Sequence, residues 1–286
     1  MNTNIIRVFP RRTHWTPVDE FAFYGPPPLF RPEDRSIPVH VSVTFTWDLP
    51  RAQKLALQWA AHYETVLMGG PVFNDSTGEF QPGLYLKEGC TITSRGCPKN
   101  CWYCDVPTRE GKLKLLRDWE AKPGWIVQDN NLLSCPDDHV SDVFWMLRTQ
   151  ERNIFFNGGL DKHFFKPFHR ELLDTIPIGE LWWACDDLNS LPALEKIVPL
   201  LDGIPLRKNR CYTMVTPDKE TMEQAEYRLN RVLELGFLPF CQLYQSHSFR
   251  VYPKEWLALQ RKWSRAAAIL AKDSATPEPE LQFEEL

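Results

Sequence analysis

Three cysteines in one short segment are the residues of this chain best suited to metal chemistry. Cys97, Cys101 and Cys104 follow a C-x3-C-x2-C spacing. Thiolates are the ligands of iron–sulfur clusters, and a tight loop can wrap three corners of a cubane. The fourth iron then has no protein ligand, and a reactive metal centre needs such an open position, as catalytic zinc sites do. The spacing therefore predicts a [4Fe–4S] cluster with one open iron.

A structural zinc site is the alternative use of these thiols. Zinc usually takes four Cys or His ligands in paired spacing, and the sequence has no second C-x2-C or H-x3-H pair. The seven histidines show no metal spacing either. Four of the other five cysteines fall in apolar segments, where they act as small hydrophobes. The five are Cys90, Cys135, Cys185, Cys211 and Cys241.

Bulk composition excludes several functional classes. The chain of 286 residues has a formal net charge of −4, so nothing in its overall charge indicates a nucleic-acid partner. It contains no run of about 18 apolar residues, so no membrane span is expected. No secretory-type apolar region stands near the first residue. We therefore expect a cytoplasmic protein.

From residue 90 onward, apolar segments alternate with helical patterns. The helical patterns lie at 140–148, 168–173, 192–201, 220–235 and 253–271. The predicted strands are 90–93, 125–128, 153–156, 180–185, 211–215 and 238–244. Alternating strands and helices indicate a parallel sheet. Each strand ends in polar or glycine residues, as strands do when their carboxyl ends form an active face. Six such units predict an α/β fold, a partial (β/α)6 TIM-like barrel.

The sequence divides into three predicted regions. Residues 1–88 form a Pro-rich arm and a small β-α-β extension, residues 89–250 form the partial barrel, and residues 251–286 form a helix and an acidic tail. The tail contains Pro and many carboxylates, so we expect it to be disordered.

The first region has its own local pattern. Residues 1–38 are rich in proline and aromatic residues and are predicted to form an irregular arm. Strands are predicted at 39–46 and 65–68. They flank a helix at 50–62, which begins at a proline.

The cysteine motif resembles the signature of the radical S-adenosylmethionine (SAM) superfamily, C-x3-C-x-aromatic-C, with Tyr103 as the aromatic residue. The resemblance covers Cys90 to about Gln245 and places the cysteines after the first barrel strand. It implies that SAM binds the open iron and that one electron cleaves it to methionine and a 5′-deoxyadenosyl radical. The radical would abstract hydrogen from a substrate that the sequence does not reveal. A low-potential electron donor, flavodoxin or ferredoxin, is also implied. The alternative is a non-catalytic iron–sulfur or zinc-binding interaction protein.

The resemblance also implies that polar residues at the strand ends hold SAM. Asp129 and Asn130 stand where family members bind the SAM amino group, although the usual GGE stretch is missing. The turns that carry these residues are equally compatible with solvated, helix-capping roles. After the fourth strand, at least one of Asp186 and Asp187 is expected to contact the ribose. The predicted cofactor-binding residues are Tyr103, Asp129, Asn130, Asn157, Gly158, Gly159, Asp161 and Asp187.

The region before the barrel resembles a fragment of the cobalamin-binding domain that precedes many radical SAM barrels. The likeness rests on residues 39–72, which end in MGGP, and Pro107 and Gly111 match a pattern of the cobalamin-associated and methylthiotransferase-like branches. The D-x-H-x-x-G motif is missing, and the region is too short for a five-stranded domain. We therefore expect a truncated domain, and cobalamin is disfavoured.

Overall fold

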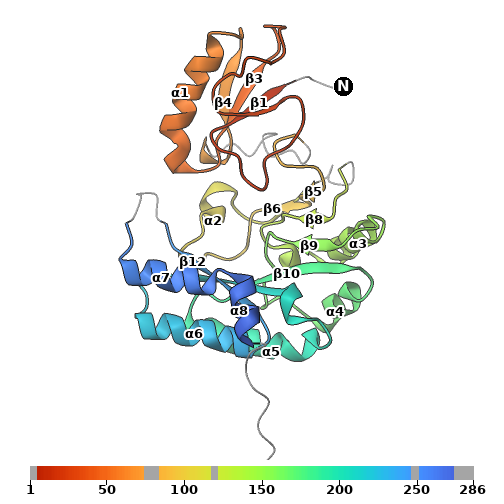
Figure 1. Ribbon diagram of the computed structural model, residues 1–286. Helices are drawn as coiled ribbons and strands as arrows, with labels where there is room; N and C mark the ends of the chain where they lie inside the picture. The colour runs from red at the N-terminus through yellow and green to blue at the C-terminus, as the bar shows by residue number, and fades with distance from the viewer. Residues whose placement is uncertain (1–4, 74–83, 117–121, 246–250, 274–286) are drawn as a thin grey trace, which may run out of the picture.

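The computed structural model describes residues 5–73, 84–116, 122–245 and 251–273. Its larger unit is a six-stranded sheet in which every neighbouring pair is parallel and strand order follows chain order (Figure 1). This is the predicted α/β architecture, an open partial (β/α)6 barrel. Its strands are β5 (Cys90–Thr91), β8 (Ile126–Val127), β9 (Ile154–Phe156), β10 (Ile178–Ala184), β11 (Asn209–Val215) and β12 (Leu238–Leu243).

The helices that follow these strands cover one face of the sheet. Side chains alternate across β11, where Cys211 and Val215 are fully buried under the helices and Tyr212 faces the other, partly open side. The apolar stripe of each helix completes the core. The helices are α3 (Asp137–Arg148), α4 (Pro167–Leu173), α5 (Leu191–Ile197), α6 (Met222–Glu234), α7 (Lys254–Trp263) and α8 (Ala266–Asp273).

The last predicted helix is two helices in the structure. The pattern at 253–271 is interrupted between α7 and α8, where the Ser264 hydroxyl donates to the Cys241 carbonyl at 2.6 Å. A serine that bonds a neighbouring strand in this way competes with the helical hydrogen bonds. The predicted acidic tail lies outside the described residues. None of the described helices is both long and apolar enough to cross a bilayer.

The smaller unit is a four-stranded parallel sheet of order β2-β1-β3-β4 with one helix. Ile6, Val41 and Trp59 are fully buried in its core. Its elements are β1 (Ile6–Phe9), β2 (Ala22–Tyr24), β3 (Val39–Ser42), β4 (Val66–Gly69) and the helix α1 (Leu49–Ala60).

The prediction of an irregular arm at residues 1–38 is wrong in this respect. β1 and β2 both lie within it, and β1 pairs with β2 on one side and β3 on the other. The strand Ile6–Phe9 is only four residues long and is followed by proline and two arginines. The local sequence therefore does not predict a strand there. Its stability comes from non-local pairing, which local propensity does not contain.

Core packing of the barrel gives a first prediction. Leu181 in β10 is fully buried, whereas Leu57 in α1 is 77% exposed. Leu181→Ala removes buried contacts and leaves a cavity, so it should lower the free energy of unfolding by about 2–5 kcal/mol. The control Leu57→Ala should change it by less than about 0.5 kcal/mol. Urea denaturation followed by circular dichroism measures both, and equal effects would contradict the described packing.

Candidate metal centre and cofactor site

The cysteine loop leaves the sheet through a short antiparallel pair, β6 (Ser94–Arg95) with β7 (Lys114–Leu115), and it contains the short helix α2 (Val106–Arg109). The predicted first barrel strand is therefore shorter than 90–93, because the chain leaves the sheet after Thr91. Gly96 begins the loop with φ +78°, and an added Cβ would stand 2.3 Å from the Lys112 carbonyl oxygen. This position requires glycine for both reasons.

A buried carboxylate anchors the start of this loop. Asp129, just after β8, is 1% exposed. It accepts hydrogen bonds from the Thr93 amide at 3.1 Å, the Thr93 hydroxyl at 2.8 Å and the Ser94 hydroxyl at 2.6 Å. Burial raises the pKa of Asp129, and these hydrogen bonds oppose the rise. These bonds occupy the carboxylate that was predicted to bind the SAM amino group. Asp129 therefore supports the loop.

The three thiols lie in one partly exposed loop. Cys97, Cys101 and Cys104 are free and of intermediate exposure. Burial raises the pKa of Cys101 and of Cys104, and the charge of Cys97 acts in the same direction on both. Metal cations bound to the three sulfurs would stabilise the thiolate forms and so lower these pKa values. Within the described ranges, no three or more His, Cys, Asp or Glu side chains are grouped so as to hold a metal ion. In a cubane each thiolate binds its own iron, so the sulfurs need not converge on one point.

Asn131 contacts the cysteine loop directly. Its side-chain amide lies 3.5 Å from the Cys97 sulfur and 3.2 Å from an oxygen of Asp161. The residue is 4% exposed, and its Oδ1 atom is buried without a hydrogen-bond partner in the described structure. The site prediction included Asn130 and omitted Asn131. The sequence Asp129-Asn130-Asn131 predicted a turn, but it did not show which of the two amides faces the thiol.

Asn130 contacts the base of the loop instead. Its amide donates to Glu110, which also accepts from the Gly96 amide at 3.2 Å and pairs with Arg95 at 3.5 Å. Asn130 therefore helps to hold the two ends of the cysteine loop together.

The turn after β9 supports the loop from the other side. Asp161 pairs with Lys99 at 3.1 Å and accepts from the His163 ring at 2.9 Å. Burial pushes the pKa of Asp161 upward, but the bonds from His163 and the charge of Lys99 outweigh it and hold that pKa below its ordinary value. Since Lys99 lies between Cys97 and Cys101, Asp161 fixes the cysteine loop over the sheet.

The predicted residues Asn157, Gly158 and Gly159 form the turn itself. A Cβ on Gly158 would stand 2.1 Å from the Asp129 carbonyl oxygen, so glycine lets the turns after β8 and β9 approach each other. Gly159 has φ +100° and open space around it. Asn157 has a buried Oδ1 without a hydrogen-bond partner in the described part of the chain. That atom and the Asn131 Oδ1 are acceptors that a ligand can use.

Tyr103 links the cysteine loop to β10. Its hydroxyl donates to Asp186, whose other oxygen accepts from the Met214 amide at 2.9 Å. Burial raises the pKa of Tyr103 and of Asp186. The predicted cofactor residue Asp187 is exposed, and its carboxylate has no hydrogen bond within the described ranges. Of the two neighbouring carboxylates, Asp186 is thus the one that faces the cysteine loop.

Two buried cationic side chains, Arg228 and Lys162, lie near Asp186. Arg228 is fully buried, pairs with Glu220 and donates to the carbonyls of Cys185 and Met214. Lys162 donates to the Ala184 carbonyl at 2.8 Å. Both charges lower the pKa of Asp186 and oppose the larger effect of burial. Neither residue was predicted, because a lysine in a turn and an arginine in a helix usually lie on the surface.

Comparisons with known proteins find similar folds among the solved structures. No protein-family model matches the chain, and no curated protein matches it. Among solved structures it is similar to the radical S-adenosylmethionine methyltransferase TsrM from Kitasatospora setae, solved with cobalamin and a [4Fe–4S] cluster bound. The TM-score is 0.58 at 13% sequence identity, over 88% of this chain and 76% of that one. At this identity the likeness shows a shared fold.

His139, which contacts the start of the cysteine loop, predicts that the stability of the fold depends on pH. His139 lies 3.0 Å from the Thr93 hydroxyl, and burial lowers the His139 pKa despite the nearby carboxylates. The unfolded chain therefore binds a proton on this residue at a higher pH than the folded chain does, so stability falls as pH falls below about 6.5.

Acidification from about pH 7.5 to about pH 5.5 should then destabilise the wild type more than His139→Gln, whose amide can still donate to Thr93. Urea midpoints at both pH values provide the measurement. Parallel pH dependence of the two proteins would show that His139 does not titrate in this range.

Proposed function

We propose that this protein is a radical SAM enzyme. The observation that carries the proposal is the position of the three thiols. They lie in one loop after the first strand of an open six-stranded parallel barrel, and side chains from the turns after β8, β9 and β10 hold that loop. The fold likeness to a radical SAM methyltransferase supports the same conclusion.

The residues present fit a [4Fe–4S] cluster with one open iron. Cys97, Cys101 and Cys104 supply three soft donors, and the Asn131 amide gives the Cys97 sulfur a hydrogen bond, as cluster thiolates commonly receive. When bound, such a cluster supplies one electron that cleaves the S–C5′ bond of SAM, giving methionine and a 5′-deoxyadenosyl radical that takes a hydrogen atom from the substrate. The electron comes from a low-potential protein donor of the flavodoxin or ferredoxin class.

The chain's own contribution is to position the reactants. Asp161 and Asp186 hold the cysteine loop at two points through Lys99 and Tyr103. The orphaned oxygens of Asn131 and Asn157 provide acceptors for the N–H groups of the SAM amino group, and the exposed Asp187 offers a carboxylate to its ribose. The substrate would then contact the inner face of β10–β12, where Tyr212 and Phe240 are partly exposed.

Cobalamin is not part of the proposed function. The similar structure contains it, but the sequence here has no D-x-H-x-x-G motif, and the described residues of the smaller unit form four strands. The proposed reaction therefore uses the cluster and SAM alone.

SAM cleavage provides the first test of the function. After anaerobic reconstitution with iron and sulfide, the protein with SAM and dithionite should form 5′-deoxyadenosine. Cys97→Ala should abolish this product because it removes a cluster ligand. Cys241→Ala, which changes a fully buried cysteine on the helix-covered face, should retain it. Liquid chromatography with mass detection measures the product.

The same assay distinguishes the alternatives. A reconstituted [4Fe–4S] protein that forms no 5′-deoxyadenosine would favour a cluster used only for binding. A protein that assembles no cluster and binds zinc instead would refute the proposal.

Asn131 provides a second test that does not depend on turnover. A hydrogen bond to a cluster thiolate stabilises the reduced state, so Asn131→Leu should lower the midpoint potential of the cluster by roughly tens of millivolts. Asn230→Leu on the outer surface of α6 serves as the control. A redox titration followed by electron paramagnetic resonance (EPR) gives both values. An unchanged potential in Asn131→Leu would show that its amide does not bond the thiolate.

A further inference from the structure

The cysteine loop carries more positive charge than the chain as a whole. Residues 95–116 contain five Lys or Arg and two Asp or Glu, whereas the whole chain has 33 of the former and 37 of the latter. Two of the five cations are neutralised by neighbours. Arg95 pairs with Glu110 at 3.5 Å, and Lys99 pairs with Asp161 at 3.1 Å. The excess of positive charge in the loop therefore comes from its other cations.

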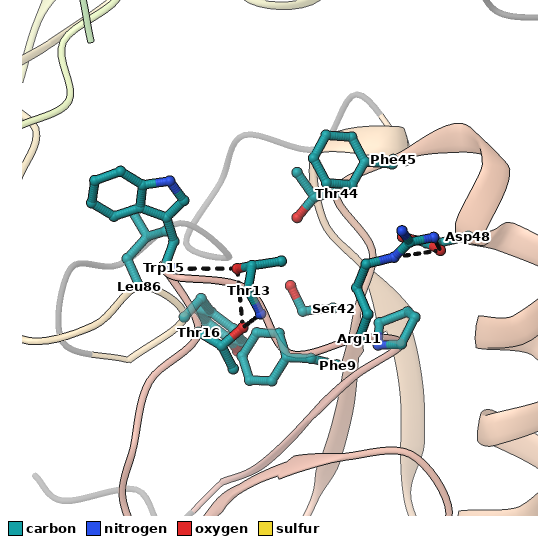
Figure 2. Close-up of a pocket in the computed structure, with 12 residues that line it drawn as sticks. Phe9, Arg11, Thr13, Trp15, Thr16, Ser42, Thr44, Phe45, Asp48 and Leu86 are labelled. Carbon is teal, nitrogen blue, oxygen red and sulfur yellow. Dashed lines mark hydrogen bonds and ion pairs between the residues drawn. The ribbon is translucent and has the colours of Figure 1, made fainter. Parts of the chain in front are cut away.

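Three cations of the loop have no ion pair in the part of the chain that the structure describes. We call them the basic ridge, and they are Arg109 at the end of α2, Lys112, and Lys114 in β7. Lys112 and Lys114 are exposed, and Arg109 is half-buried. By contrast, Figure 2 shows Arg11 of the smaller unit paired with Asp48, so that its charge is already neutralised. An unpaired group of cations attracts a partner of opposite charge from solution.

The lysines of the ridge point away from the barrel. Leu113 and Leu116 pack against the barrel core, whereas Lys112 and Lys114, on either side of Leu113, are exposed. Leu115, beside Lys114, is 44% exposed and adds an apolar contact to the same surface. A substrate inside the barrel mouth would not meet these side chains. The ridge is therefore a surface for a partner that approaches from outside.

The backbone of the ridge is hydrogen-bonded to the first of the three cysteines. The Cys97 amide donates to the Gly111 carbonyl at 3.2 Å, and an added Cβ on Gly96 would stand 2.3 Å from the Lys112 carbonyl oxygen. The strand β7, which carries part of the ridge, also pairs with β6, which leads into the cysteine loop. An electron that enters at the ridge therefore has a short covalent and hydrogen-bonded path to a cluster held by Cys97.

From these observations we propose that the basic ridge is the docking surface for the reductant of the cluster, a small acidic electron carrier of low potential. This inference rests on the proposed radical SAM function. The transfer moves one electron from the reduced carrier to the oxidised cluster, and no bond or proton changes place.

The size of the ridge favours a protein of this kind over a nucleic acid. Electron-transfer complexes are weak and have small interfaces, and opposite charges bring the two proteins together. A nucleic acid depends on many phosphate contacts for its affinity at physiological salt. Three unpaired cations suit the first partner better than the second.

Turnover with two reductants tests the proposal. The full-length reconstituted protein is mixed with SAM and either dithionite or a reduced acidic flavodoxin, and the rate of 5′-deoxyadenosine formation is measured. At limiting flavodoxin, the ridge variant Lys112→Glu/Lys114→Glu should react about tenfold or more slowly than the wild type, because attraction between charges raises association rates by about 10–10³-fold. With dithionite the two proteins should react at the same rate, because a small inorganic reductant needs no docking surface.

A matched charge reversal on the barrel is the control. Lys196 on α5 and Arg207, just before β11, are exposed and have no ion pair among the described residues. They lie near the amino ends of the strands, whereas the cysteine loop lies at the carboxyl ends. Lys196→Glu/Arg207→Glu should keep wild-type rates with both reductants. Raising NaCl from about 50 mM to about 300 mM should slow the flavodoxin reaction of the wild type and hardly change that of the ridge variant.

The two reductants separate the possible failures. If dithionite supports no 5′-deoxyadenosine formation, the radical SAM function is refuted and the docking surface with it. If dithionite supports turnover but flavodoxin drives the wild type and the ridge variant equally, or drives neither, the docking proposal alone is overturned. Tight binding of a single-stranded oligonucleotide that only the ridge variant loses would reassign the ridge to a nucleic acid.

Discussion

The buried carboxylate of Asp129 is the constraint on which the candidate site depends. It lies inside the sheet at the end of β8 and holds the segment Thr93–Ser94, from which the cysteine loop departs. Burying a carboxylate is costly unless hydrogen bonds satisfy it, and here three groups do so. Its backbone also sets the distance to the next turn, since Gly158 packs against the Asp129 carbonyl oxygen. The loop therefore starts from a fixed point, although the loop itself is irregular.

From that point, the carboxyl ends of the parallel strands hold the loop at successive positions. Asn131 follows β8, Asp161 follows β9 and Asp186 follows β10, and each contacts the cysteine loop or a side chain within it. Residues far apart in the chain meet there because parallel strands end at the same edge. Arg228 and Lys162 lower the cost of burying Asp186 below that edge. The arrangement leaves the thiols partly exposed in a loop that side chains from three strand ends contact, as a positioned cluster requires.

Much of this was predictable from the sequence, and the exceptions have physical reasons. The six strand positions and the cysteine loop follow from local patterns, which are strong for buried strands. Ile6–Phe9 was missed because a four-residue strand gains its stability from partners 15 and more residues away. Asn131 could not be chosen over Asn130 because backbone angles in a turn decide which amide faces the thiol. The contact of Asp186 with the cysteine loop was predictable, since the alternation from Trp182 places Asp186 on the inner face.

Labelled SAM provides the most direct test of the central claim that Cys97, Cys101 and Cys104 leave one iron open to SAM. The reduced, reconstituted protein is mixed with SAM that carries ¹⁵N in its amino group, and electron–nuclear double resonance (ENDOR) is recorded on the cluster signal. The account predicts a ¹⁵N hyperfine coupling, because the amino group binds the open iron. A [4Fe–4S] signal that shows no coupling to the label would contradict it.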